Sequence, residues 1–252
     1  MTNVLTPEPT PAVAETPLAS EAEAREVAEA AREHKWEAPS FVRQLFEGSL
    51  RMDLIHPFPQ PSEEELAKAR PFLEALEQFL REEVDADKID REGKVPESVI
   101  QGLRELGAFG IKIPEEYGGL GLSQLMYTRA IGLVTSQDGS LTALMSAAQS
   151  IGVPTPLKMF GTPEQKARYL PRLAKGAISA FALTEGNVGS DPAGLATVAE
   201  LSPDGTHYIL NGEKLWCTNG TIADLMVVMA RTGKKISAFI VEADWPGVEV
   251  VE

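Results

Sequence analysis

Cysteine is nearly missing from this 252-residue sequence, in which Cys217 is the single example. One thiol excludes a disulfide within the chain and a metal site built from several cysteines. It agrees with a reducing compartment, so we expect a bacterial-type cytoplasm, with peripheral association with a membrane left open for the complete protein.

Basic residues are also scarce, because 23 Lys and Arg stand against 37 Asp and Glu and give a net charge of −14. A nucleic-acid backbone binds clustered Lys and Arg, so this balance argues against nucleic acid as a partner. The same charge gives no long-range attraction for any other polyanionic ligand. Such a ligand must therefore be bound by suitably placed local groups and not by the overall charge of the chain.

Long apolar runs are missing as well. No run of about 20 apolar residues is present that would span a bilayer, so we expect no transmembrane segment. The N-terminus lacks the basic and apolar regions of a secretory signal and is too acidic for a mitochondrial transit peptide. The length suffices for one large or two smaller globular domains that bury roughly 70–75% of the unfolded surface.

The first 61 residues are predicted to form a disordered or extended N-terminal extension. Residues 1–20 are rich in Pro, Ala, Thr and Glu and cannot bury an apolar face. Residues 21–34 are typical of a solvated helix. Residues 56–61 form a stiff connector, because each Pro keeps the preceding residue out of the helical conformation.

Residues 62–178 are predicted to form an all-α domain. Two capping boxes open its first and last helices, Ser62 with Glu65 and Thr162 with Gln165. Pro71 predicts a bend in the first helix, which should reach residue 84, or a later start for it. Further helices are expected at 96–106, 123–135 and 140–151, with an extended piece at 109–114.

From Ser179 the hydrophobic period changes from 3.6 residues to 2, which indicates strands. We expect strands at residues 180–183, 197–201, 207–211, 214–218, 224–230 and 236–241. The fold class is therefore α+β, with the helical domain at 62–178 followed by a β domain at 179–252.

Two stretches of the β domain carry the chemistry. The first segment, residues 183–191, has Gly186, Gly189 and Ser190 in a loop whose backbone N–H groups suit an anion without any basic side chain. The second segment, residues 214–220, is expected as a strand that puts Trp216 and Thr218 on one face and Cys217 on the other. An indole plate beside a hydroxyl suits a planar ligand.

The motifs Leu183-Thr-Glu…Gly189-Ser-Asp191 and Trp216-Cys-Thr-Asn-Gly220 together resemble the flavin-binding signature of the acyl-CoA dehydrogenases. Residues 106–121, 149–152 and 160–171 resemble further motifs of that family, and residues 40–48 and 56–59 are most similar to its very-long-chain branch. The resemblance implies a helical N-terminal domain and an incomplete, β-barrel-like middle domain. The family's four-helix C-terminal domain is absent from this sequence.

By this resemblance the cofactor is FAD. Its contacts would come from Phe181, Leu183, Thr184, Gly189, Ser190, Trp216, Cys217 and Thr218. Thr184 would meet the pyrimidine edge of the flavin, Thr218 would lie near N5, and Trp216 would pack on the ring. Gly189 and Ser190 would meet the pyrophosphate, and Ser190 would also edge the substrate's thioester. No catalytic residue is expected in the chain, because the family's glutamate base would lie beyond Glu252.

The activity implied by the resemblance is α,β-dehydrogenation of long-chain fatty acyl-CoA in β-oxidation, with electron-transfer flavoprotein as electron acceptor and a homo-oligomer as the complete protein. An inactive flavin- or acyl-CoA-binding module and an acyl-CoA oxidase remain as alternatives.

Glu185 is expected to be a loop residue rather than a base. The sequence departs from the family pattern at Gly186, Val188 and Ala148, the last of which puts a polar contact at a helix end in question.

Overall fold

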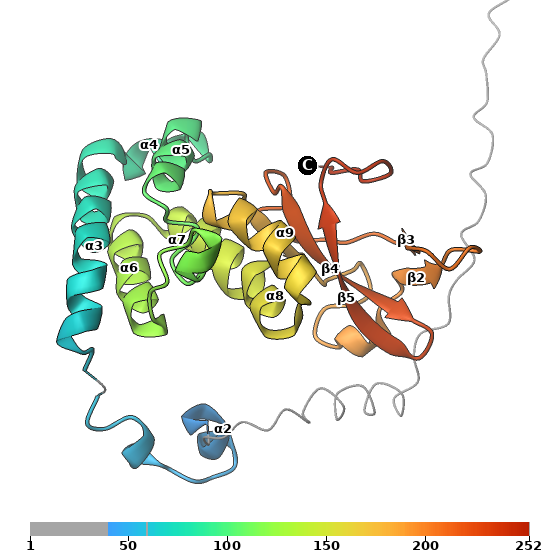
Figure 1. The fold of residues 1–252 in the computed structure, drawn as a ribbon, viewed down its shortest axis with the longest axis horizontal. Helices are drawn as coiled ribbons and strands as arrows, with labels where there is room; N and C mark the ends of the chain where they lie inside the picture. The colour runs from blue at the N-terminus through green and yellow to red at the C-terminus, as the bar shows by residue number, and fades with distance from the viewer. Residues whose placement is uncertain (1–39, 59, 252) are drawn as a thin grey trace, which may run out of the picture.

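The computed structural model describes residues 40–58 and 60–251, so the expectations for residues 1–39 lie outside the described residues. Helices occupy one end of the molecule and a sheet the other (Figure 1). The helices are α2 (Phe41–Phe46), α3 (Glu63–Glu83), α4 (Ala86–Glu92), α5 (Glu97–Glu105), α6 (Gln124–Gln137), α7 (Gly139–Ser146), α8 (Pro154–Phe160) and α9 (Pro163–Ala174). A π-helical segment, Ala147–Ile151, directly follows α7.

The helix α3 begins where its sequence predicts. The Ser62 side chain accepts from the N–H of Glu65, and the Glu65 carboxylate accepts from the N–H of Ser62, which completes the predicted capping box. Pro71 lies inside the helix, so the later start considered for it is wrong. One face of the helix packs into the helical core through Ala69, Phe72, Leu76 and Leu80.

The sheet is organised around the hydrophobic strand β4 (Leu225–Thr232), which pairs with three other strands. The other members of the sheet are β1 (Ser179–Ala182), β2 (Val198–Leu201), β3 (Tyr208–Asn211) and β5 (Lys235–Glu242). Along one edge, β4 pairs antiparallel with β5; along the other, it runs parallel to β1 and, further along, to β2. The strand β3 extends the sheet by pairing antiparallel with β2.

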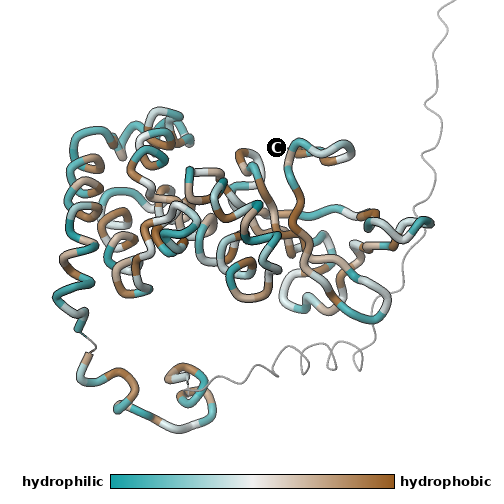
Figure 2. The backbone as a smooth tube through the Cα atoms, viewed as in Figure 1, coloured by the Kyte–Doolittle hydropathy of each residue, from teal (hydrophilic) through white to brown (hydrophobic). Residues whose placement is uncertain are grey.

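Helices α8 and α9 connect the two parts of the fold. Their residues Leu157, Tyr169 and Leu170 belong to the same buried cluster as Leu225 and Val227 of β4. The strands β4 and β5 appear as hydrophobic stretches against these helices in Figure 2. This packing fixes the sheet on the helical part.

A polar contact ties the start of β1 to the π-helical segment. The Ser179 hydroxyl donates to the carbonyl oxygen of Ala148 at 2.6 Å and accepts from the N–H of Val153 at 3.0 Å. Ser179 is fully buried, so these bonds satisfy a hydroxyl that water does not reach. At the same end of the sheet, where Leu225 pairs with Ser179 on one side and with Glu242 on the other, Glu242 accepts from Arg168 and Arg172 of α9 at 2.6 and 2.7 Å.

Several predicted elements are confirmed with small shifts of their ends, namely the strands near 197–201, 207–211, 224–230 and 236–241 and the helices near 62–84, 96–106 and 123–135. The extended piece predicted at 109–114 is wrong, because these residues form successive turns. The helix predicted at 140–151 is α-helical only to Ser146 and π-helical beyond it. The short helix α2 lies within the extension that was expected to be disordered or extended.

The strand predicted at 214–218 is also wrong. Residues 212–217 have no regular structure, and Trp216 and Asn219 have positive φ values of 54° and 68°. A left-handed backbone breaks the alternation of a strand, because successive side chains then no longer point to opposite faces. The second segment is therefore a shaped loop beside the sheet.

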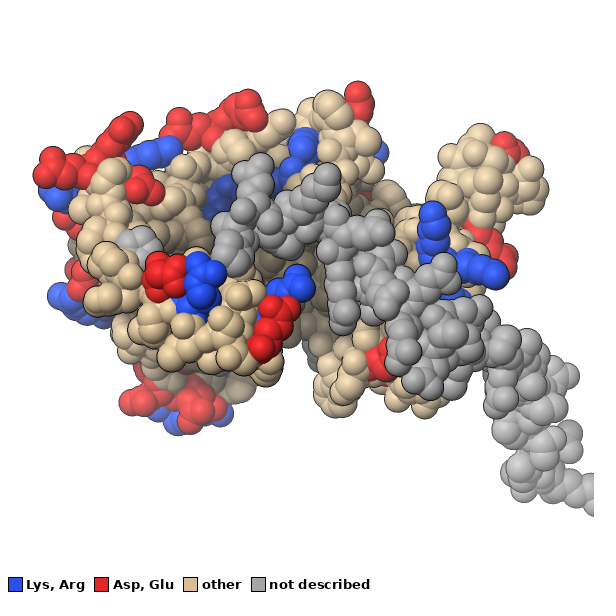
Figure 3. Space-filling view, turned by 90° about the horizontal axis from the view of Figure 1, so that it is seen from below, with Lys and Arg blue, Asp and Glu red and all other residues tan. Residues whose placement is uncertain are grey.

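Surface charge is mixed in the described part of the chain. Seen from below, acidic and basic side chains are interspersed over the helical part, and no broad basic face is visible from this side (Figure 3). No helix within residues 40–58 and 60–251 combines the length and the apolar character needed to cross a membrane.

Candidate functional site

The second segment lies along the edge of β1 that is not paired with β4. Three carbonyl oxygens at alternate positions of this edge accept hydrogen bonds from side chains. The bonds run from Asn219 Nδ2 to Ser179 O (3.2 Å), from Cys217 Sγ to Phe181 O (3.3 Å) and from Lys214 Nζ to Leu183 O (3.2 Å). Side chains thus take the place of a neighbouring strand at this edge.

A backbone bond joins the two segments directly. The N–H of Leu215 donates to the carbonyl oxygen of Thr184 at 2.9 Å. Cys217 is half-buried among apolar residues of the sheet. Its burial raises the pKa of the thiol, although the bond to Phe181 O acts in the opposite direction. The thiol therefore stays protonated at neutral pH and remains a donor.

Trp216 points away from the sheet. Its neighbours Leu215 and Cys217 are bonded to the β1 side, whereas the indole is 89% exposed. Thr218 is exposed as well, and its hydroxyl makes no hydrogen bond to any residue that the structure describes. Trp216 and Thr218 are thus both exposed while Cys217 is half-buried, in a loop with a left-handed residue at 216 rather than in the expected strand.

The loop of the first segment leaves its own donors free. Val188 is buried, and it exchanges two hydrogen bonds of 3.0 Å with Glu185. Within the described part of the chain, the N–H groups of Gly186, Gly189 and Ser190 make no hydrogen bond, and these residues are exposed. A Cβ atom added to Gly189 would meet nothing within 4 Å. The loop therefore presents backbone donors beside open space.

Glu185 holds these pieces together. Its carboxylate is buried and accepts from Ala196 N at 2.6 Å, from Thr197 N at 3.0 Å and from Thr197 Oγ1 at 2.5 Å. It also forms an ion pair of 2.6 Å with Lys214 Nζ, and both side chains are 10% exposed or less. Burial acts to raise the pKa of Glu185, but the bonds from Lys214, Thr197 and Ala196 outweigh it and lower that pKa.

The sequence did not predict the role of this pair. It indicated only that Glu185 is a loop residue, and it placed Lys214 in a strand. One sequence feature is consistent with the pair. Each segment has a charged residue near its start, the acidic Glu185 directly after Thr184 and the basic Lys214 directly before Leu215. No hydrogen bond joins Gly189 or Ser190 to the second segment in the described structure, so the two segments are connected through Leu183, Thr184 and Glu185.

Polar contacts near Ala148 come from its own backbone and from the side chain of Gln149. Ala148 is buried, and its carbonyl oxygen receives the Ser179 hydroxyl. The side chain of Gln149 accepts from Ile111 N at 3.2 Å and donates to Ala108 O at 2.7 Å. The π-helical segment is therefore fixed both to β1 and to the turn before residue 111.

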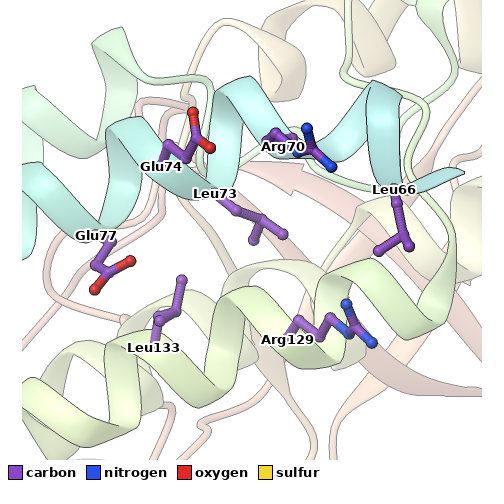
Figure 4. Close-up of a pocket in the computed structure, with 7 residues that line it drawn as sticks. All are labelled: Leu66, Arg70, Leu73, Glu74, Glu77, Arg129 and Leu133. Atoms are coloured by element: carbon purple, nitrogen blue, oxygen red, sulfur yellow. The ribbon is translucent and has the colours of Figure 1, made fainter. Parts of the chain in front are cut away.

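A groove of about 200 Å³ lies elsewhere, between α3 and α6. Figure 4 shows Leu66 and Leu73 of α3 pointing towards α6, which contributes Leu133 and Arg129 to the groove. These helices lie at the end of the molecule away from the sheet (Figure 1), so the groove is separate from the two segments. Among the residues that the structure describes, no group of three or more His, Cys, Asp or Glu could hold a metal ion.

Comparison with known protein families gives two matches. Residues 67–177 match the family model for the acyl-CoA dehydrogenase N-terminal domain, and residues 180–252 match that for the acyl-CoA dehydrogenase middle domain. The chain belongs to the acyl-CoA dehydrogenase family. The boundary between the two matches falls between the end of α9 and the start of β1, where the helical part of this acyl-CoA dehydrogenase chain gives way to the sheet.

The similarity is high over most of the chain. A probable acyl-CoA dehydrogenase of Mycobacterium tuberculosis, FadE10, is 54% identical over 237 residues, which is 92% of this chain and 36% of that protein. The human mitochondrial very long-chain specific acyl-CoA dehydrogenase is 40% identical over 226 residues, 85% of this chain and 34% of that protein. The chain thus spans about a third of the length of these relatives.

A solved structure shares the arrangement of helices and sheet. An acyl-CoA dehydrogenase from Bacillus anthracis, solved in complex with FAD, superposes with a TM-score of 0.62 at 36% identity. The match covers 77% of this chain and 33% of the other. The predicted fold, a helical domain followed by a partial sheet domain, is confirmed.

Proposed function

We propose that this chain binds FAD through its two segments and serves the α,β-dehydrogenation of long-chain fatty acyl-CoA, with an electron-transfer flavoprotein as electron acceptor. The observation that carries the proposal is the bond from Leu215 N to Thr184 O. It joins the first segment to the second, which carries the exposed indole of Trp216 and the hydroxyl of Thr218. The names of the relatives support the reaction and the preference for long chains.

The exposed indole fits a planar ligand. A non-glycine residue with positive φ costs on the order of 1–3 kcal/mol, and Trp216 has a φ of 54° while its side chain is 89% exposed. Packing within the described chain does not account for holding a large aromatic ring in this way. A flavin ring stacked on the indole would bury it.

The loop fits a pyrophosphate. Free N–H groups at Gly186, Gly189 and Ser190 offer donors to phosphate oxygens, and the open space beside Gly189 lets the backbone approach closely. The nearby cation does not serve this purpose, because the ammonium of Lys214 is already paired with Glu185. In this proposal the pyrophosphate is therefore bound by backbone N–H groups and not by basic side chains.

Each predicted contact residue then has a task. Trp216 stacks on the ring, the Thr184 hydroxyl and the backbone at Leu183 and Thr184 meet its pyrimidine edge, and the Thr218 hydroxyl donates near N5. Gly189 and Ser190 bind the pyrophosphate, and Ser190 borders the substrate's thioester. Phe181 and Cys217 hold the second segment in place through their mutual hydrogen bond.

FAD, when bound, would accept the hydride that leaves the β carbon of the substrate. The contribution of this chain is to orient the ring and to place donors where negative charge develops, and one such donor is commonly worth about 3 kcal/mol. The Thr184 hydroxyl makes no hydrogen bond within the described residues, so it is available for this role.

The test is the absorbance spectrum of the purified chain after addition of FAD and removal of the excess, followed by titration with palmitoyl-CoA and with butyryl-CoA. We expect a retained flavin whose spectrum is perturbed at lower concentrations of the longer acyl-CoA. Trp216→Leu should retain less flavin at unchanged helix content. A wild-type chain that retains no flavin would count against the proposed cofactor site, and equal responses to both acyl-CoAs would count against the long-chain preference.

A further inference from the structure

The carboxylate of Glu185 lies where three parts of the chain meet. It belongs to the first segment, it accepts from the backbone at Ala196 and Thr197 just before β2, and it is paired with Lys214 of the second segment. The loop from residue 186 to residue 195 is thus closed at its neck by one side chain. Lys214 in turn donates to Leu183 O at 3.2 Å.

Both oxygens of this carboxylate accept hydrogen bonds from the chain itself. Oε2 receives Ala196 N, and Oε1 receives Thr197 N, Thr197 Oγ1 and Lys214 Nζ. A proton acceptor in catalysis must reach the substrate within hydrogen-bond distance, whereas this carboxylate is 7% exposed and surrounded by its own donors. Glu185 therefore holds neighbouring parts of the chain in place and does not react with a substrate.

The Glu185–Lys214 pair has no net charge, which suits a position near the proposed pyrophosphate. An isolated carboxylate beside a bound pyrophosphate would repel it, and an isolated buried ammonium would be costly to desolvate. Paired at 2.6 Å, the two groups cancel each other's charge. They connect the segments without adding net charge next to an anionic ligand.

We propose that the Glu185–Lys214 pair is a positioning device that sets the two flavin-binding segments against each other, an inference that rests on the function proposed above. In this proposal the pair makes no contact with the ring or the phosphate, because its hydrogen bonds go to the chain itself. It fixes the neck of the loop that carries Gly189 and Ser190, and it fixes the start of the segment that carries Trp216 and Thr218. Loss of the pair loosens both at once.

The experiment compares Glu185→Gln with Glu242→Gln. Both carboxylates are buried, with side chains 6% and 10% exposed, and both are held by cations at 2.6–2.7 Å. Glu242 ties α9 to β5 and has no contact with either segment. Both changes remove a buried negative charge that cations hold, but only Glu185→Gln should alter the flavin site.

Two readouts separate positioning from stability. Glu185→Gln should weaken FAD binding at least about tenfold, since it removes one charge-assisted acceptor from the junction. It should also speed hydrogen exchange at residues 186–197 and 214–219, measured without flavin and well below the unfolding temperature. Glu242→Gln should leave both quantities unchanged while lowering the unfolding temperature.

Substitutions at Lys214 refine the comparison. Lys214→Arg keeps the cation and should stay close to wild type, whereas Lys214→Met should behave like Glu185→Gln. The exchanged pair Glu185→Lys with Lys214→Glu should not rescue binding, because the N–H groups of Ala196 and Thr197 would then face a cation.

Failure of the positioning role and failure of the proposed FAD binding would give different results. If the wild-type chain binds no FAD, the cofactor proposal fails, and the exchange comparison still judges the positioning role. Unchanged exchange in both segments of Glu185→Gln would overturn the inference. So would equal effects of Glu185→Gln and Glu242→Gln on FAD affinity and on exchange, because the role would then be general stabilisation.

Discussion

Leu215 donates its backbone N–H to the carbonyl oxygen of Thr184 at 2.9 Å, although the two residues are 31 positions apart in the chain. This bond brings together the two motifs that the sequence shows as separate. With Cys217 bonded to Phe181 on the other side of Trp216, it holds the backbone of Trp216 beside β1. The predictions below test this arrangement.

Gly189→Ala should reduce FAD affinity by about tenfold and leave the unfolding free energy within about 1 kcal/mol of wild type. The added methyl group would meet no atom of the chain within 4 Å, so folding tolerates it, but it would occupy the space proposed for the pyrophosphate. Gly132→Ala is the matched control, because a Cβ there also meets nothing and Gly132 lies on α6. Equal FAD affinity in both variants would contradict the assignment of the loop.

Thr218→Val should weaken FAD binding by roughly fivefold to tenfold, the equivalent of about 1 kcal/mol for one hydrogen bond. The change removes a donor and keeps the shape, and the hydroxyl has no partner within the described chain whose loss would affect folding. Thr221→Val, an exposed change a few residues further on, is the control. If the two variants bind FAD equally well, Thr218 faces away from the ligand.

Acid should destabilise the sheet as the pH falls below the ordinary glutamate value of 4.5. The pKa of Glu185 is lowered by its bonds from Lys214, Thr197 and Ala196 against the opposing effect of burial, and that of Glu242 is lowered first by Arg172. A carboxylate with a lowered folded-state pKa contributes stability above its unfolded pKa and loses it as the pH falls through the folded pKa.

Urea unfolding at a series of pH values checks this dependence. The free energy of unfolding should decrease with falling pH below about 4.5, and Glu185→Gln and Glu242→Gln should each make the decrease shallower. Glu77→Gln, which removes an exposed ion pair with Arg81, should leave the slope unchanged. An equal slope in all four proteins would show that neither buried carboxylate is linked to folding.

Ser179→Ala should lower the free energy of unfolding by about 1–3 kcal/mol, because it leaves a buried carbonyl at Ala148 and a buried N–H at Val153 without their partner. Ser140→Ala, an exposed change in α7, is the control and should stay within about 0.5 kcal/mol. Thermal or urea unfolding followed by circular dichroism measures both. A loss below 0.5 kcal/mol at Ser179 would mean that the contact between β1 and the π-helical segment contributes little.

The sequence allowed much of the fold to be predicted, because its signals are local. Ser62 with Glu65 and Thr162 with Gln165 mark helix starts through bonds between residues three positions apart. The change of hydrophobic period at Ser179 is also a local signal, because it is visible within a few neighbouring residues, and it marks the start of the sheet. The short helix α4 was missed, although Asp85 at its start and Gly93 at its end carry cap signals.

The site depends on contacts between distant residues, which pattern reasoning does not resolve. Residues 214–218 alternate as a strand does, but side-chain bonds from Lys214, Cys217 and Asn219 to the edge of β1 replace strand pairing there. The left-handed turn at Trp216 follows from that attachment. Burial of the Glu185–Lys214 pair is likewise a property of the folded chain that neither residue shows alone.

The most direct test of the central claim is a titration of the isotope-labelled chain with FAD, followed by the NMR chemical shifts of its backbone amides and of the Trp216 indole. The account predicts that the largest changes cluster at residues 183–190 and 214–219, even if binding is weak, and that the groove between α3 and α6 is unaffected. Absence of any change at millimolar FAD, or changes that cluster away from these two segments, would contradict it.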